Sequence, residues 1–281
     1  SYICYYIVGG DILIDYHIHT KFSKDARQTM DGVCKQAIDM GLKEICITDH
    51  WDMNPSGKSF DFDLNYDEYS KEYNRCKKLY GDKINMRKGL EIGLQSHLLD
   101  EIEKLLRDKD FDFILGSIHY VNKIDLFGKQ FYKNKSKKDA FTEYLNEVYR
   151  CISRFDNFDS LGHLDVIRRY CRYDDKDLKL NDYSDTINKI LKTLIRKNKS
   201  LEANIAAGRF GIGNIQPSEE ILKQYVKLGG KKLTLGSDAH TSEQFAIERG
   251  KYINILSECG FTHITGYKNR QPYFIPIDEL E

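Results

Sequence analysis

Histidine and carboxylate side chains recur along this chain in short clusters that could bind metal ions. In chain order the clusters are Asp15-Tyr16-His17-Ile18-His19, Thr48-Asp49-His50, Gly89-Leu90-Glu91, Gly116-Ser117-Ile118-His119, Leu161-Gly162-His163, Leu201-Glu202-Ala203-Asn204 and Gly236-Ser237-Asp238-Ala239-His240. They contain six of the eight histidines of the protein. Imidazoles and carboxylates suit divalent ions such as Zn²⁺, Mn²⁺ or Fe²⁺. The lack of thiolates in the clusters argues against a closed structural zinc site.

The spacing within two of these clusters places pairs of candidate ligands on one side of the chain. Residues i and i+2 of an extended strand point to the same face. His17 and His19 can therefore reach one centre, and so can Asp238 and His240. One such pair would be weak evidence for a metal site, whereas seven clusters in a similar position are strong evidence.

Each cluster lies at the end of a short apolar segment that is typical of a buried parallel strand. We predict strands over residues 12–17, 44–48, 84–90, 111–118, 158–162, 200–204 and 232–236. A segment with the apolar spacing of a helix follows each strand. Seven strand–helix pairs in succession, with no linker between them, predict one parallel α/β domain.

An open doubly wound sheet and a closed barrel would both produce this alternation of strands and helices. The positions of the clusters favour the barrel, because the carboxyl ends of barrel strands converge on one face, where catalytic residues lie. Ligands that are scattered along the sequence would then be close together in space.

Length, charge and cysteine content exclude several other classes of protein. The 281 residues include 43 basic and 43 acidic side chains, so no net charge attracts the protein to nucleic acid. No apolar run approaches the roughly 18 residues of a membrane-spanning helix. The seven cysteines include no C-x-x-C pair, and we interpret them as reduced thiols of a cytoplasmic protein.

As a set, the motifs resemble the PHP (polymerase and histidinol phosphatase) superfamily and, within it, the histidinol-phosphatase branch. The motifs that carry the resemblance are DYHIHT, ICITDH, GLEIG, LGSIHYV, LGHLDVIRRY, LEANIAAGR and LGSDAH. The resemblance implies an α/β fold, a single-domain distorted seven-stranded (βα)7 TIM-like barrel. It also implies two or three divalent metal ions (Zn, Mn or Fe). We assign residues 12–281 to this domain and regard residues 1–11 as an N-terminal extension without an assigned role.

The resemblance implies nine metal ligands: His17, His19, Asp25, His50, Glu91, His119, His163, Asp238 and His240. His17, His19, Glu91 and Asp238 would hold one ion. Glu91 would bridge to a second ion, held also by His119 and His163. Asp25, His50 and His240 would hold a third. Asp25 stands where many members of the family have histidine, and a carboxylate is a competent replacement ligand.

The resemblance also implies roles in catalysis and substrate binding. Glu91, Asp238 and His240 would be catalytic, Arg169 and Arg209 would hold the substrate phosphate, and Asn204 would be a polar contact nearby. Ile205 stands where the family usually has a polar residue. We expect Glu202 to be a buried partner of a cation, and Asp49 to orient a ligand or a water molecule.

A metal-dependent phosphomonoesterase is the activity that the resemblance implies. It would convert L-histidinol phosphate and water to L-histidinol and phosphate in histidine biosynthesis, by attack of hydroxide bound to metal. Two alternatives stay open: a PHP phosphoesterase that acts on a nucleotide, a sugar phosphate or phosphotyrosine, and a non-catalytic PHP module that binds metal. The expected partner is a small phosphorylated metabolite, with no nucleic acid or membrane. A homo-oligomer is compatible with the sequence, which does not decide the oligomeric state.

Overall fold

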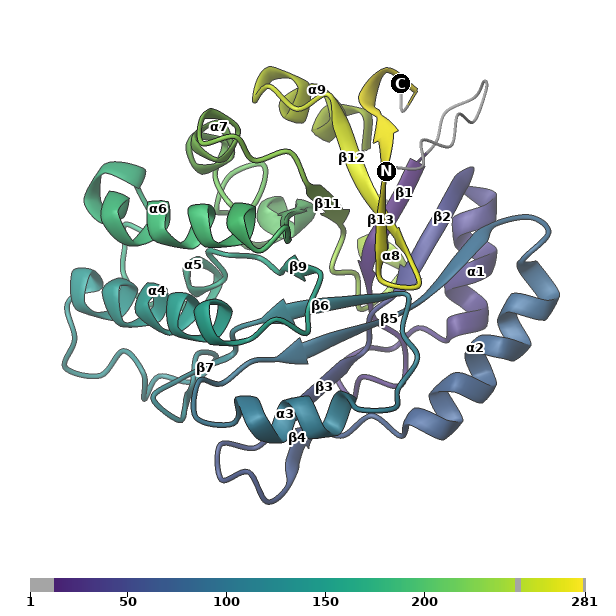
Figure 1. The fold of residues 1–281 in the computed structure, drawn as a ribbon, viewed down its shortest axis with the longest axis horizontal. Coiled ribbons are helices and arrows are strands. Elements are labelled where there is room, and N and C mark those ends of the chain that lie inside the picture. Colours follow the sequence, from purple (N-terminus) through teal and green to yellow (C-terminus); the bar gives the residue numbers. More distant parts are fainter. Residues whose placement is uncertain (1–12, 246–248, 280–281) are drawn as a thin grey trace.

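Seven parallel strands form the central sheet of the computed structural model, which describes residues 13–245 and 249–279 (Figure 1). In spatial order they are β1 (Leu13–Ile18), β2 (Leu42–Ile47), β5 (Asn85–Gly93), β6 (Phe113–Ser117), β9 (Ser160–Leu161), β10 (Ser200–Asn204) and β11 (Leu233–Gly236). The first and last strands meet, because Asp238 N donates to His17 O (2.7 Å) and His19 N donates to Ala239 O (2.9 Å). The nearly closed sheet is the predicted seven-stranded barrel. The predicted extension, residues 1–11, lies outside the described residues.

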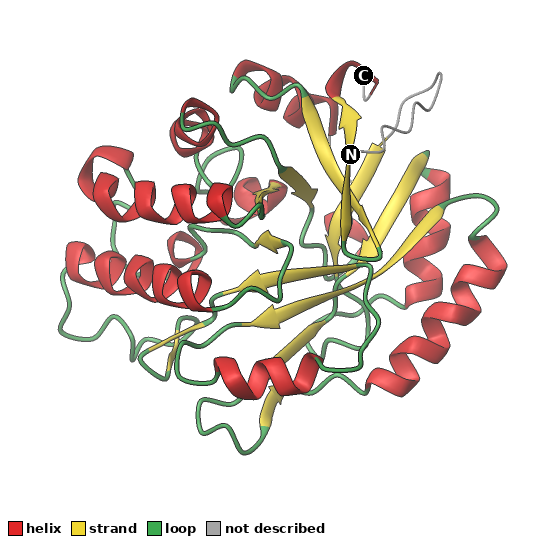
Figure 2. Ribbon diagram, viewed as in Figure 1, coloured by secondary structure: helices red, strands yellow, loops and turns green. Residues whose placement is uncertain are grey.

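Helices cover the outer side of the sheet (Figure 2). The helices of the described ranges are α1 (Met30–Asp39), α2 (Tyr66–Tyr80), α3 (Leu99–Leu106), α4 (Lys137–Arg154), α5 (Ile167–Tyr170), α6 (Leu180–Arg196), α7 (Glu219–Lys227), α8 (Ser242–Phe245) and α9 (Arg249–Glu258), with the 3-10 helices η1 (Ile205–Phe210) and η2 (Ile277–Glu279). Of these, α5 and η1 lie at the carboxyl ends of the strands instead, beside the histidine clusters. The apolar side chains whose spacing predicted the helices face inward, as in α6, where Ile187, Ile190 and Leu194 are fully buried. No helix in the described ranges is long and apolar enough to cross a membrane.

The structure contains three pairs of short strands that the sequence pattern did not predict. They are β3 (His50–Met53) with β4 (Phe60–Phe62), β7 (Tyr120–Val121) with β8 (Ile124–Asp125), and β12 (His263–Lys268) with β13 (Gln271–Pro276). His50, which was expected to follow the second strand, instead begins β3 and pairs with Glu91 of β5. β3, β4, β7 and β8 have two to four residues each, too few to show a periodicity, so only their tertiary partners define them.

The predicted strand over residues 158–162 is reduced to the two residues of β9. The chain approaches β6 closely just after β9, and a Cβ atom at Gly162 would lie 2.3 Å from Oγ of Ser117. Glycine at this position therefore lets His163 follow directly beside the neighbouring strand.

The hairpin of β12 and β13 packs over the amino ends of the barrel strands, opposite the histidine clusters. Tyr267 N donates to the Tyr16 hydroxyl (2.6 Å), and Asn269 N donates to the Asp112 carboxylate (2.9 Å), which directly precedes β6. The Phe113 ring is fully buried, with its centroid 5.2 Å from that of Tyr16 and 5.2 Å from that of Tyr267. Aromatic packing thus joins this hairpin to β1 and β6.

Replacing Phe113 by alanine should destabilise the barrel strongly, because a large cavity would open between the hairpin and the sheet. We expect the Phe113→Ala variant to lose about 3–5 kcal/mol of unfolding free energy, measured by urea denaturation. The matched control is Leu79→Ala on α2, since Leu79 is 51% exposed and should change stability by no more than about 0.5 kcal/mol. Equal effects of both substitutions would contradict the packing described here.

Candidate metal centre

Glu91 of β5 is the centre of a group of histidines at the carboxyl ends of the strands. Its side chain is fully buried. Five imidazole nitrogens lie within 3.4 Å of its carboxylate: Nε2 of His17 (3.0 Å), Nε2 of His19 (3.2 Å) and Nδ1 of His50 (3.2 Å) beside Oε2, and Nε2 of His163 (2.9 Å) and Nε2 of His119 (3.4 Å) beside Oε1. One carboxylate therefore connects four strands of the barrel and the short strand β3.

Asp238 adds a second carboxylate on the side of His17 and His19. Its Oδ1 atom lies 3.4 Å from Nε2 of His17 and 3.3 Å from Nε2 of His19. The other oxygen, Oδ2, accepts a hydrogen bond from the guanidinium of Arg169. The backbone of Asp238 has a φ of 55°, a left-handed conformation that aspartate tolerates better than most residues. Such strain is common where a structure holds a functional side chain in place.

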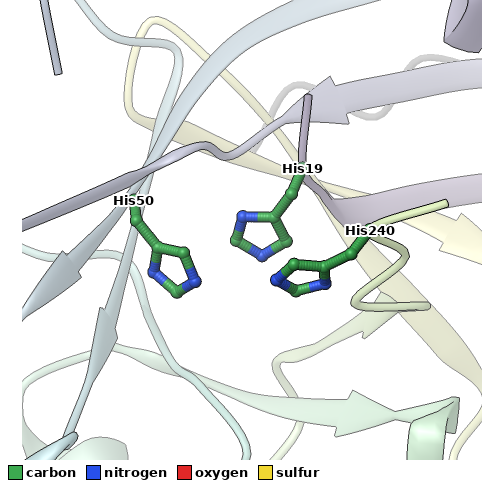
Figure 3. Close-up of side chains that lie close together, drawn as sticks. All are labelled: His19, His50 and His240. Carbon is green, nitrogen blue, oxygen red and sulfur yellow. The ribbon is translucent and has the colours of Figure 1, made fainter. Parts of the chain in front are cut away.

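Three histidines from distant parts of the chain lie together beside this group (Figure 3). The His19 ring is stacked between two others, with centroids 4.3 Å from His50 and 4.1 Å from His240. The Asp25 carboxylate, from the loop after β1, has Oδ2 3.4 Å from Nε2 of His240 and 3.9 Å from Nε2 of His50. The structure thus brings together Asp25, His50 and His240, and places His19 beside them.

All nine predicted ligands lie in this one site, and its donor atoms fit divalent metal ions. Sets of three ligand atoms within 4.8 Å of one another include His17 with His19 and Glu91, Glu91 with His119 and His163, and His19 with His50 and His240. Nε2 of His19 and Nδ1 of His50 are buried without a hydrogen-bond partner. Because buried polar atoms rarely lack a partner, these nitrogens are suited to binding a cation.

Two further carboxylates contact the histidines on the side away from Glu91. Glu202 Oε1 lies 2.5 Å from Nδ1 of His17, and Asp52 Oδ2 lies 2.5 Å from Nδ1 of His119. A carboxylate in this position fixes the tautomer of a histidine and raises its basicity as a ligand. Glu202 is the buried partner that the sequence led us to expect. Asp52 was missed, although its position two residues after His50 would have revealed it had β3 been recognised.

Asp49 holds the loop that follows β1. Its carboxylate accepts hydrogen bonds from the backbone and hydroxyl of Thr20 (2.6 and 2.7 Å) and of Ser23 (3.1 and 2.7 Å). The Ser23 hydroxyl lies 3.1 Å from Nδ1 of His19. Asp49 therefore orients a histidine through Ser23, and the same loop carries Asp25.

A pocket of about 360 Å³ opens onto the site, and three arginines line it: the exposed Arg27, Arg169 and Arg209. Arg169 is buried and donates to Asp238, to Oδ1 of Asn204 (3.0 Å) and to Oε1 of Gln216 (2.7 Å). Arg209 is more exposed and donates from Nη2 to the backbone carbonyls of Ser237 and Asp238 (2.9 Å each). Arg169 and Arg209 therefore line the pocket next to the Asp238 carboxylate or its backbone.

Asn204 occupies a different place from the one expected for a substrate contact. It is fully buried behind Arg169 and does not belong to the pocket lining among the described residues. Its amide nitrogen lies 3.2 Å from Oε2 of Glu202, and its amide oxygen accepts from Arg169. Asn204 therefore connects the arginine to the carboxylate that orients His17.

Electrostatic interactions keep the carboxylates of the site ionised. Burial alone would raise the pKa of Glu91, but its interactions with the surrounding imidazoles, His17 above all, outweigh burial and hold that pKa well below its usual range. The pKa of Asp238 is also held well below normal, since His17 and Arg169 outweigh burial. Burial lowers the pKa of His19, yet the nearby carboxylates of Asp238 and Glu91 outweigh it and raise the value to about 9. Protons and metal ions must therefore compete for the imidazoles.

Sequence comparison relates the chain to proteins of one family. The sequence model of the PHP domain matches residues 15–206. The histidinol-phosphatase of Lactococcus lactis subsp. lactis (strain IL1403) is 34% identical over 256 residues, which cover 90% of this chain and 94% of that protein. A probable histidinol-phosphatase of Clostridium acetobutylicum is 33% identical over 269 residues, covering 93% and 100% of the two chains.

Two solved structures are similar to this chain. The crystal structure of histidinol phosphate phosphatase from Lactococcus lactis, complexed with zinc, L-histidinol and phosphate, matches with a TM-score of 0.84 and 31% identity. The match covers 92% of this chain and 98% of that one. A putative histidinol phosphatase from Listeria monocytogenes has a TM-score of 0.75 at 18% identity, covering 85% and 100% of the chains, and supports the fold alone.

The contact between Glu202 and His17 provides a test of the metal centre. We expect Glu202→Gln to weaken zinc binding by roughly 10- to 100-fold, because the amide cannot support the imidazole as a carboxylate does. Competition with a chromophoric chelator would measure the affinity. The matched control is Glu101→Gln on the exposed face of α3, which should leave the affinity unchanged. Unchanged affinity in Glu202→Gln would contradict the proposed support of His17.

Zinc binding should release protons near neutral pH. Because the pKa of His19 in the metal-free fold is about 9, above the ordinary 6.5, its proton stabilises that fold fully below pH 6.5 and is lost as pH rises through 9. Ligation needs the neutral ring, so zinc should displace about one proton from His19 at about pH 7.5. Calorimetric titration in two buffers of different ionisation enthalpy measures this release. A release that stays constant up to about pH 10 would contradict the assignment.

Proposed function

The chain belongs to the PHP domain family, and from this premise we propose that it is a metal-dependent histidinol-phosphatase. As a phosphoric monoester hydrolase, it converts L-histidinol phosphate and water to L-histidinol and phosphate. The observation that carries this proposal is the group around Glu91, in which five imidazoles lie beside one buried carboxylate. Glu91 lines a pocket that Arg169 and Arg209 line as well. Similarity to histidinol-phosphatases over nine-tenths of the chain supports the substrate.

We propose that two or three divalent ions, of zinc, manganese or iron, bind at this centre. The first would be held by His17, His19, Glu91 and Asp238, the second by Glu91, His119 and His163, and the third by Asp25, His50 and His240. When bound, such ions lower the pKa of water and neutralise charge on phosphoryl oxygens. The buried nitrogens of His19 and His50 without partners support this distribution.

The arginines and His240 supply the other requirements of phosphate ester hydrolysis. A guanidinium matches the geometry of a phosphate better than an ammonium does, so Arg209 and Arg169 are suited to hold the phosphate in the pocket. The pKa of Arg169 is raised, since the charge of Asp238 outweighs the effect of burial, and Arg169 therefore stays charged. His240 is at the edge of the pocket, with Nδ1 3.0 Å from the carbonyl oxygen of Asp238. There it can contact the phosphate, next to Glu91 and Asp238.

The size of the pocket and the state of the cysteines support our proposals about the partner and the cellular compartment. The pocket is of a size to admit a small phosphorylated metabolite as the partner. Six cysteines of the described ranges are free and buried, which supports a reducing compartment such as the cytoplasm. A phosphoesterase for another substrate would use the same centre, so the choice of substrate is what activity measurements must decide.

Phosphate release from L-histidinol phosphate is the direct test of the function. We expect the protein to prefer it over a nucleotide, a sugar phosphate and phosphotyrosine, to lose activity after chelation, and to regain it when zinc or manganese is added. Activity on another member of the panel alone would overturn the substrate. If the protein releases phosphate from none of them while metal is still bound, a non-catalytic PHP module would be favoured.

Glu91→Ala tests whether this carboxylate bridges two ions. We expect activity to fall by at least about 1,000-fold, because charge stabilisation in the transition state is usually the largest catalytic contribution. Metal content, measured by mass spectrometry of the purified protein, should fall as well. The control is Glu101→Gln, which should keep both. Retention of activity and metal by Glu91→Ala would refute the bridging role.

A further inference from the structure

One wall of the metal pocket is apolar and aromatic, although the rest of the pocket is charged. Phe127, Val166, Tyr170 and Phe210 line it together with the histidines and arginines. Neither a metal ion nor a phosphate gains from an apolar neighbour. These side chains therefore need another explanation than the binding of the ions and the phosphate.

Three rings form a continuous row across this wall, which we call the aromatic wall (Phe127, Tyr170 and Phe210). The Phe127 and Tyr170 centroids are 4.4 Å apart at 66°, and the Tyr170 and Phe210 centroids are 6.2 Å apart at 69°. Edge-to-face arrangements of this kind are favourable for aromatic pairs. The guanidinium of Arg169 packs over Phe210, 4.8 Å from the ring centroid. The aromatic wall is thus built from the segment after β8, from α5 and from η1, and Arg169 joins it to the charged side.

Phe127 is the ring of this wall that lies most open to solvent. It is 41% exposed, and Leu79 is the other large apolar side chain reported as exposed among the described residues. Leu79 lies on α2 and does not line the metal pocket, whereas Phe127 does. The Phe127 ring centroid is 6.0 Å from that of His119. An exposed ring thus lies beside the metal centre.

We propose that the aromatic wall, and Phe127 in particular, binds the organic part of the substrate and selects a flat ring such as imidazole. This inference rests on the proposed function. When the phosphate is held by the arginines and the metal centre, the carbon side of the ester must extend toward the uncharged side of the pocket. A neutral imidazole can stack there or meet the rings edge to face, and a protonated imidazole gains a cation–π contact.

The test compares two substrates that differ in the ring alone. L-alaninol phosphate keeps the amino alcohol and the phosphate of L-histidinol phosphate but has a methyl group in place of the imidazolylmethyl group. We expect Phe127→Ala to raise KM for L-histidinol phosphate by about fivefold to tenfold, as the loss of one aromatic contact predicts. We expect kcat to change by less than about twofold, since the phosphate is held elsewhere. KM for L-alaninol phosphate should stay the same.

Two further variants separate ring recognition from a structural effect. Phe127→Tyr keeps the ring and should keep the wild-type KM. Leu79→Ala removes an exposed apolar side chain away from the pocket and should change neither constant. Zinc content should be equal in all three variants, because none of the changed residues is a proposed ligand.

The outcomes distinguish this inference from the function on which it rests. If the wild-type protein releases no phosphate from L-histidinol phosphate, the proposed function fails and the inference fails with it. If the wild-type protein is active but Phe127→Ala raises KM equally for both substrates, or for neither, the inference alone is overturned.

Discussion

The structure depends on one unusual interaction, the burial of the Glu91 carboxylate among five imidazoles. A buried anion is costly unless opposite charges or hydrogen-bond donors surround it. Five histidines meet this requirement, two from the end of β1 and one each from β3 and from the segments after β6 and β9, and each has a ring nitrogen within 3.4 Å of the Glu91 carboxylate. A closed barrel is well suited to this, because all of its strands end around the same axis.

The same constraint explains the layer of carboxylates behind the histidines. Each ring that faces Glu91 with one nitrogen has a second nitrogen on its other side. Glu202 lies 2.5 Å from this nitrogen of His17, and Asp52 lies 2.5 Å from that of His119. Asp49 acts on His19 indirectly, because it accepts a hydrogen bond from the Ser23 hydroxyl, which lies beside that ring. Negative charge thus alternates with imidazole from the centre outward, so that the site keeps an anionic character when its rings are neutral.

The sequence predicted which candidate ligands lie together but missed much of their surroundings, and the reason is physical. His17 and His19 could be paired because the period of two is a local property of a strand. The residues at the ends of parallel strands could be grouped because the barrel imposes that grouping. Asp52 lies on a strand too short to recognise, while the position of Asn204 behind Arg169 and the row formed by Phe127, Tyr170 and Phe210 depend on side chains far apart in the sequence. Such contacts leave no periodic signal.

The meeting of β1 with the segment after β11 has a consequence for how the protein is made. The first strand of the barrel obtains its neighbour on one side from residues 237–239, through hydrogen bonds to Asp15, His17 and His19. During synthesis the ribosome delivers the amino-terminal histidines long before Asp238 and His240, and chains begin to fold from that end. A nascent chain therefore cannot bring all nine candidate ligands together until Asp238 and His240 have been synthesised.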